Sequence, residues 1–205
     1  MKINDYECKM CGECCKNVPC ELVPEDLPIL LSRFEMSFKE FFKKYLIAVP
    51  CNTGDKADTI LRLSPVRAKD GERFKTYLED TDYMEAIDKG GECIFLKDNK
   101  CIIHDIKPLG GRIMKCAKMT GGLTLQFTTA QYFIYWYNNQ QIFYELSKEV
   151  EEVLKEAENL YAKADKCYED YVKLNDDKKI DEYKAYVSKA DKLMNNRLKV
   201  VLNEI

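Results

Sequence analysis

Apolar residues recur at every third or fourth position through the last third of the chain, the pattern of helices packed along a shared seam. The first series is Leu146, Val150, Val153, Ala157, Leu160, Ala164, Cys167, Tyr171 and Leu174. The second series is Ile180, Tyr183, Val187, Ala190, Met194, Leu198 and Val201. A polar stretch, Asn175-Asp176-Asp177, separates the two series. The pattern predicts an antiparallel hairpin of two helices, over about residues 141–174 and 180–202, that supplies no metal ligands.

The first half of the chain predicts shorter elements. Pro24-Glu25-Asp26-Leu27 is typical of a helix start, and Ser37 with Glu40 three residues later is typical of a capping box before a second helix. Strands are expected at 59–64 and 123–128, and a short helix at 80–89. A hairpin is expected where segments 92–96 and 100–103 flank Lys97-Asp98-Asn99.

Proline and glycine divide the chain into two regions. All prolines lie at or before Pro108 and all glycines at or before Gly122, whereas no helix-breaking residue follows. We therefore expect a cysteine-rich metal-binding domain over residues 1–122, with one or more short β-hairpins, and a helical region over 123–205. The predicted fold class is α+β and mostly helical.

Composition and charge narrow the classes of function. The net charge is −3 with 33% charged residues of both signs, which disfavours nucleic acid as a partner. The N-terminus lacks the apolar run of a signal peptide, and the longest apolar stretch, Tyr132 to Tyr137, is too short to span a bilayer. We expect a cytoplasmic protein without a membrane partner, in which clustered cysteines bind metal or react rather than form disulfides.

Five of the ten cysteines lie between Cys8 and Cys20. The spacing Cys8-x2-Cys11-x2-Cys14-Cys15 can place three thiolates around one point, and Gly12 suits the turn between them. Iron–sulfur clusters use such a run with a remote fourth cysteine, whereas structural zinc combines two separated pairs. An ordinary ferredoxin is disfavoured because Val18 stands where its fourth cysteine would be.

The other cysteines differ in their context. Cys93 and Cys101, at the ends of the expected hairpin, are ligand candidates, and Cys116 is a further one. Cys20 is a reserve ligand, whereas Cys51 is expected to be structural and Cys167 to belong to the helical core. The only histidine, His104, is left out of the site. The predicted metal ligands are Cys8, Cys11, Cys14, Cys15, Cys93, Cys101 and Cys116.

These motifs resemble the signature of the CxxCxxCC family of zinc- or iron-chelating domain proteins. The first motif is Cys8 to Cys15, and the second runs through Cys93-Ile94-Phe95-Leu96, Cys101-Ile102-Ile103-His104 and Lys107-Pro108-Leu109-Gly110-Gly111-Arg112. The resemblance covers about residues 6–118 and implies a metal held by cysteines from both motifs. One departure is that Gly111 stands where the family has its last cysteine, so Cys116 is a candidate to replace it.

Three functions are compatible with these observations. The favoured one is a cytoplasmic protein that carries an iron–sulfur cluster, preferably 4Fe–4S, for electron transfer, cluster delivery or maturation of a partner enzyme. The alternative is a structural zinc module that docks a partner protein through its helical hairpin. A protein-modifying, methylase-like enzyme ranks last, because the chain has no glycine-rich cofactor motif and little room for a substrate domain.

Overall fold

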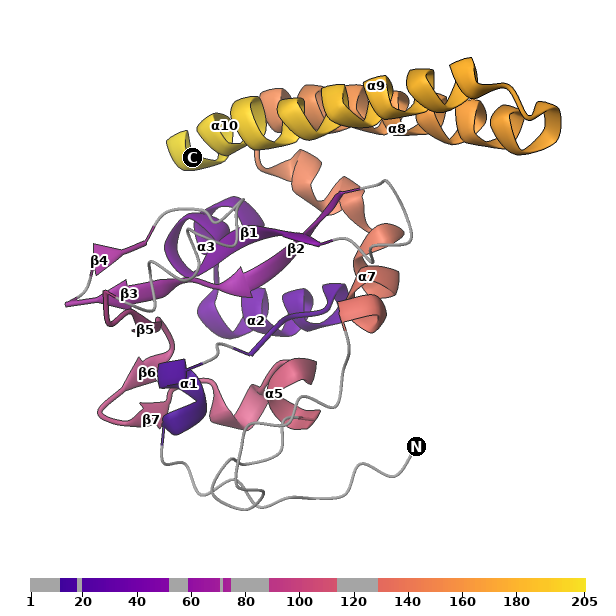
Figure 1. Cartoon of the computed structure of the whole chain (residues 1–205). Coiled ribbons are helices and arrows are strands. Elements are labelled where there is room, and N and C mark those ends of the chain that lie inside the picture. Colours follow the sequence, from indigo (N-terminus) through magenta and orange to yellow (C-terminus); the bar gives the residue numbers. More distant parts are fainter. Residues whose placement is uncertain (1–11, 18–19, 52–58, 71, 75–88, 114–128) are drawn as a thin grey trace.

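The computed structural model describes residues 12–17, 20–51, 59–70, 72–74, 89–113 and 129–205, and Figure 1 shows their arrangement. A long helical hairpin lies at one end of the molecule, and the short elements that carry the cysteine motifs lie at the opposite end. Helices predominate, and the strands are short and antiparallel, so the predicted α+β, mostly helical fold class is confirmed. No helix within these described ranges is both long and apolar enough to cross a bilayer.

Three small sheets make up the β-structure. β1 (Leu46–Cys51) pairs with β2 (Ile60–Pro65), which confirms the strand expected at 59–64. The second sheet places β3 (Arg67–Lys69) between β4 (Glu72–Arg73) and β5 (Glu92–Cys93). The third sheet pairs β6 (Leu96–Lys97) with β7 (Lys100–Cys101).

The hairpin expected over 92–103 is smaller than predicted. Only β6 and β7 form it, and Asp98 and Asn99 between them have φ angles of 48° and 60°, the left-handed values of a tight primed turn. The expectation of one continuous strand over 92–96 is wrong, because β5 pairs with β3 instead. Cys93 and Cys101 therefore belong to two different sheets and are not at the two ends of one hairpin.

Two short helices pack beside the first sheet. The start at Pro24 is confirmed as η1 (Pro24–Asp26), which leads directly into α2 (Leu27–Phe34). The capping box is also confirmed at the start of α3 (Phe38–Tyr45): Ser37 accepts a hydrogen bond from the Glu40 backbone, and the Glu40 carboxylate accepts one from the Ser37 backbone. The rings of Phe34, Phe41, Tyr45 and Phe95 pack together on the buried side.

The predicted helical hairpin is confirmed. α8 (Lys148–Leu174) is capped at its start by Ser147 and ends at Asn175, whose left-handed φ of 51° closes the turn. α9 (Asp177–Lys192) starts at its cap Asp176 and continues through η4 (Leu193–Leu198), a π-helical segment, into α10 (Lys199–Glu204). The expected start near residue 141 is wrong, since η3 (Gln140–Glu145) is a separate 3-10 helix.

One continuous apolar core joins the hairpin to the rest of the protein, with buried residues from Leu22 to Leu202. α7 (Thr129–Tyr137) contributes Trp136, which is fully buried and donates from Nε1 to the Leu22 carbonyl at 3.0 Å. The Gln140 side chain donates to the Leu61 carbonyl at 2.7 Å and accepts from the Leu61 amide at 2.8 Å. These bonds attach the segment before the hairpin to β2 and to the chain before η1.

Three sequence predictions lie outside the described residues. They are most of the helix at 80–89, the strand at 123–128, and the domain boundary between residues 122 and 123. The division into domains 1–122 and 123–205 therefore stays a prediction.

Candidate metal centre

The first cysteine motif ends in a single helical turn, α1 (Glu13–Asn17), which carries Cys14 and Cys15. Gly12 precedes it with a φ of +77°, as the predicted turn requires. A Cβ atom on Gly12 would lie 2.9 Å from the Asn99 carbonyl oxygen and 3.1 Å from Leu96 Cδ1. Glycine is therefore required at this position both by the backbone angle and by the close approach of the β6–β7 turn. This contact brings the two cysteine motifs together.

A buried arginine fixes the other end of α1. Arg67 is fully buried in β3, and its Nη1 donates to the Lys16 carbonyl at 3.1 Å and to the Gly91 carbonyl. Lys16 lies in α1 and Gly91 directly precedes β5, so one guanidinium joins three segments that are distant in sequence. The hydrogen bonds satisfy backbone carbonyls that would otherwise be buried without donors.

Thiols from both motifs meet beside these elements. The side chains of Cys15 and Cys101 hydrogen-bond to each other, and this bond, together with burial, raises the pKa of the Cys101 thiol above its ordinary value of 9.0. Burial also raises the pKa of Cys20, and negative charge on Cys101, Cys15 and Asp26 adds to the increase. Neighbouring thiols therefore disfavour the ionised forms of Cys20 and Cys101, and a metal bound nearby would favour those forms because it supplies positive charge.

Asp26 attaches the second motif to the chain just after Cys20. Its buried carboxylate accepts hydrogen bonds from the amides of Val23 at 2.9 Å and Leu109 at 3.0 Å. Arg112 lies 3.5 Å from the same carboxylate. Burial raises the pKa of Asp26. The hydrogen bonds from Val23 and Leu109 lower it, but they do not cancel the effect of burial. Leu109 begins α5 (Leu109–Ile113), so the Lys107–Arg112 segment is fixed against residues 20–26.

Three other cysteines within the described ranges, Cys51, Cys93 and Cys167, are buried. Cys93 is buried in β5, which contacts α1, and belongs to the apolar core. Cys51 is buried in β1, where burial raises its pKa to about 11. Cys167 is buried in α8, as predicted for a core position, with its sulfur 3.6 Å from a Glu182 carboxylate oxygen. Burial lowers the pKa of His104, whose Nε2 has no hydrogen-bond partner in the described part of the chain.

The predicted ligand set is only partly visible. Cys8, Cys11, Cys116 and the Cys14 side chain lie outside the described residues. Within the described ranges, no three His, Cys, Asp or Glu side chains are arranged to hold a metal ion as they stand. The seven predicted ligands therefore remain a prediction, of which the structure brings Cys15 and Cys101 together.

Sequence reasoning undervalued three residues at this site. The sequence predicts Cys20 only as a reserve ligand, yet in the fold the charges of Cys15 and Cys101 act on it. Asp26 and Arg67 were given no role at the site, although they position its backbone. The only local signal was the closeness of Cys20 to the first motif, because the partners of Asp26 and Arg67 are distant in sequence.

Comparison with known proteins agrees with this geometry. The family model "CxxCxxCC: Putative zinc- or iron-chelating domain" matches residues 7–167, which is more than half of the chain, and the protein therefore belongs to this family. The match extends beyond residue 118, where the resemblance of the motifs was expected to end, and includes most of α8. No curated protein and no solved structure matches the chain.

Proposed function

We propose that this protein holds a metal centre with cysteine ligands from both motifs, and that the centre is an iron–sulfur cluster, with 4Fe–4S favoured over zinc. The observation that carries the proposal is the hydrogen bond between Cys15 and Cys101, supported by Cys20, on which the charges of both thiols act. These two thiols come from segments that are distant in sequence, and backbone contacts on both sides hold those segments together. Cysteines buried by chance would not need such an arrangement.

The number of thiols favours a cluster over a single zinc ion. Structural zinc takes four ligands, whereas this region offers seven predicted ligands and Cys20. The repeated two-residue spacing of Cys8, Cys11 and Cys14 also occurs in proteins that bind cubane clusters. The ligands must stay reduced to bind metal, which fits a protein of the cytoplasm. Its proposed task is electron transfer, cluster delivery or maturation of a partner enzyme.

To identify the metal, the full chain is purified without oxygen and assayed for iron, acid-labile sulfide and zinc. We expect iron and acid-labile sulfide in equal amounts, with broad visible absorbance. About one zinc per folded chain in a colourless protein would favour the structural zinc module instead. A folded chain without iron and without zinc would refute the proposal as a whole.

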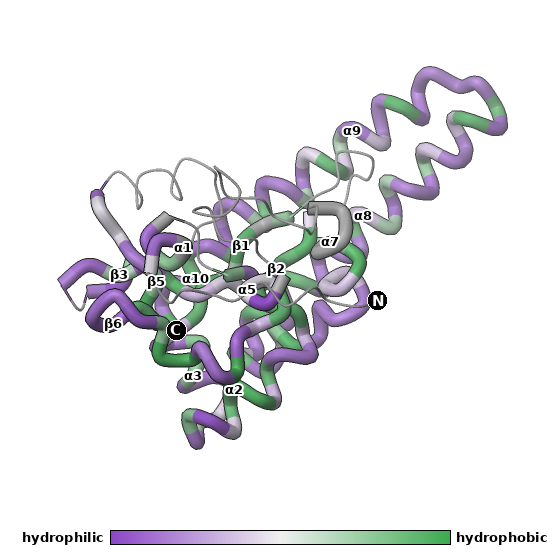
Figure 2. Tube along the Cα trace, turned by 90° about the horizontal axis from the view of Figure 1, so that it is seen from below, coloured by the Kyte–Doolittle hydropathy of each residue, from purple (hydrophilic) through white to green (hydrophobic). Residues whose placement is uncertain are grey.

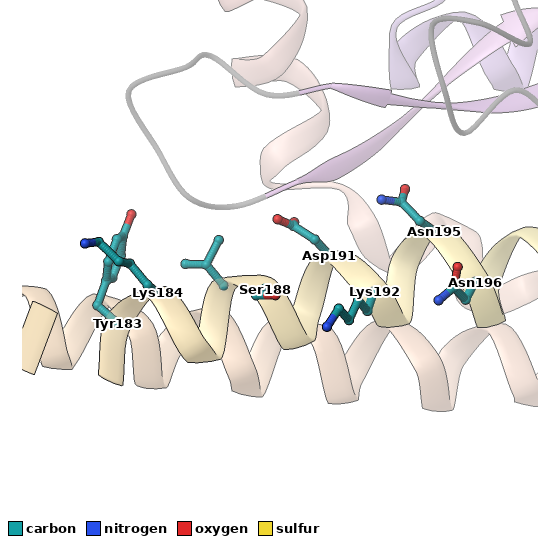
Figure 3. A pocket seen from close by; sticks show the side chains of 8 residues that line it. Tyr183, Lys184, Ser188, Asp191, Lys192, Asn195 and Asn196 are labelled. Carbon is teal, nitrogen blue, oxygen red and sulfur yellow. The ribbon is translucent and has the colours of Figure 1, made fainter. Parts of the chain in front are cut away.

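We also propose that the helical hairpin binds the partner protein. The end of the hairpin projects past the rest of the molecule (Figure 2), and Val172 and Leu174 there are 63% and 69% exposed. Farther along α9, an open groove is lined by polar and charged side chains that include Tyr183, Asp191 and Asn195 (Figure 3). Apolar side chains beside polar ones are typical of a protein-binding surface, and none of the groove's lining residues is a thiol.

A charge substitution at the hairpin end tests the partner surface in the full chain. A photoreactive group placed at position 168, where Tyr168 is half exposed, should crosslink one defined protein. The double variant V172E/L174E should lose this crosslink while keeping its metal content. The control I29E introduces one glutamate in place of an exposed apolar residue of α2, and this variant should keep the crosslink. Retention of the crosslink in V172E/L174E would refute the surface, and a crosslink only to a second copy would make it a self-association surface.

A further inference from the structure

Gly111 leaves a space in α5 that another side chain fills. A Cβ atom built on Gly111 would lie 3.2 Å from Cys20 Cβ and 3.5 Å from Cys20 Sγ. The first distance is tighter than most Cβ contacts and the second is an ordinary van der Waals contact, so a side chain at position 111 would need the Cys20 side chain to give way by a few tenths of an ångström. Cys20 thus lies, with its sulfur, against the point of α5 from which a side chain at position 111 would start.

The same sulfur lies within electrostatic reach of two other thiols. Cys20 is close enough to Cys101 and to Cys15 for the charge of each to act on it. Cys15 and Cys101 in turn hydrogen-bond to each other. Cys20 therefore lies in the neighbourhood of the Cys15–Cys101 pair.

The position of Cys20 is held by the backbone on both of its sides. The Asp26 carboxylate bonds the amides of Val23 and Leu109, so the chain after Cys20 cannot separate from the start of α5 without breaking buried hydrogen bonds. Before it, α1 is fixed by the Arg67 bond to Lys16. The contact between Cys20 and Gly111 is thus a fixed feature of the fold.

We propose that Cys20 is a metal ligand of this protein and that it takes the place left without a thiol by Gly111. The proposal rests on the proposed metal centre and assigns it a ligand that was not among the seven expected ones. In this proposal Cys20, and not Cys116, replaces the ligand that is missing at Gly111. Cys116 lies five residues beyond Gly111 in the sequence.

The reciprocal swap of the two residues is the sharpest test. Four full-length proteins would be purified without oxygen: wild type, Cys20→Ser, the double variant C20G/G111C, and the control Cys51→Ser. The swap returns one thiol to the site from the other side of the contact, and glycine at position 20 removes the two nearest of the atoms that a Cβ at 111 would meet. The control removes a buried thiol from β1. Each protein is assayed for iron, sulfide and zinc per folded chain, for the rate of metal loss to EDTA, and for its urea unfolding midpoint.

Cys20→Ser should hold its metal at least about 100-fold more weakly, since loss of a residue that merely supports a ligand already costs about 10–100-fold. The swap should restore metal to near the wild-type level, and Cys51→Ser should keep it. Wild-type retention in Cys20→Ser would overturn the proposal. A C20G/G111C variant that folds but holds no metal would also overturn it, because a thiol at position 111 would then fail to replace the thiol of Cys20. A wild type without metal would refute the metal centre itself, which is a separate outcome.

Discussion

Replacing Arg67 by methionine tests whether the buried guanidinium positions α1 at the site. The substitution keeps most of the side-chain volume but removes the donors to the Lys16 and Gly91 carbonyls. Leaving a buried acceptor without a donor costs about 1–3 kcal/mol, so two such losses amount to about 2–6 kcal/mol. Relief from burying a charged group offsets a part of this. We therefore expect Arg67→Met to lower the free energy of unfolding by about 2–4 kcal/mol.

An exposed arginine provides the matched control. Arg197 is 46% exposed and lies 3.9 Å from Glu149 and 3.7 Å from Glu156, geometry typical of weak surface ion pairs. Arg197→Met should therefore cost at most about 1 kcal/mol. Urea unfolding followed by circular dichroism gives both values, and chelator challenge gives metal retention. Equal destabilisation by the two substitutions would refute the role of Arg67 in stability. Unchanged metal retention in folded Arg67→Met would refute its role in positioning α1.

Three further predictions concern other contacts. Ser37→Ala removes the cap of α3 and should lower the free energy of unfolding by about 1 kcal/mol, measured by urea unfolding. Trp136→Phe loses the bond to the Leu22 carbonyl and some buried volume, so a loss of about 2–3 kcal/mol is expected in the same assay. Because the pKa values of Cys20 and Cys101 are raised, metal must displace protons, and its affinity should rise about tenfold per pH unit for each proton displaced. Chelator competition at pH 6, 7 and 8 measures this slope, and a flat profile would contradict it.

Local patterns in the sequence predicted the helical hairpin, one helix cap and one tight turn. The two apolar series predicted α8 and α9, because a helix that packs along one side must repeat its apolar residues every three or four positions. The Ser37 capping box and the Asp98-Asn99 turn were also predicted, since each depends on a few neighbouring residues. Turn geometry and helix caps are decided by side chains within reach of their own backbone.

Long-range pairings could not be predicted in the same way. Cys93 was predicted in the same hairpin as Cys101 because strand patterns do not identify the partner strand, whereas β5 in fact pairs with β3. The contact between Cys20 and Gly111 joins segments about 90 residues apart, and no local pattern reports it. Arg67 was overlooked because arginine is usually exposed, and only the fold shows the carbonyls that make its burial acceptable.

The hydrogen bond between the Cys15 and Cys101 side chains also has a consequence for the unfolded chain. A metal held by both residues would close a loop of roughly 90 residues, and closing a loop of that length by a covalent bridge removes about 4–5 kcal/mol of chain entropy from the unfolded state. A metal centre here would act as a cross-link between the beginning and the middle of the chain. The midpoint of thermal unfolding would then follow the concentration of free metal, and the cell's metal supply would set how much of the protein is folded.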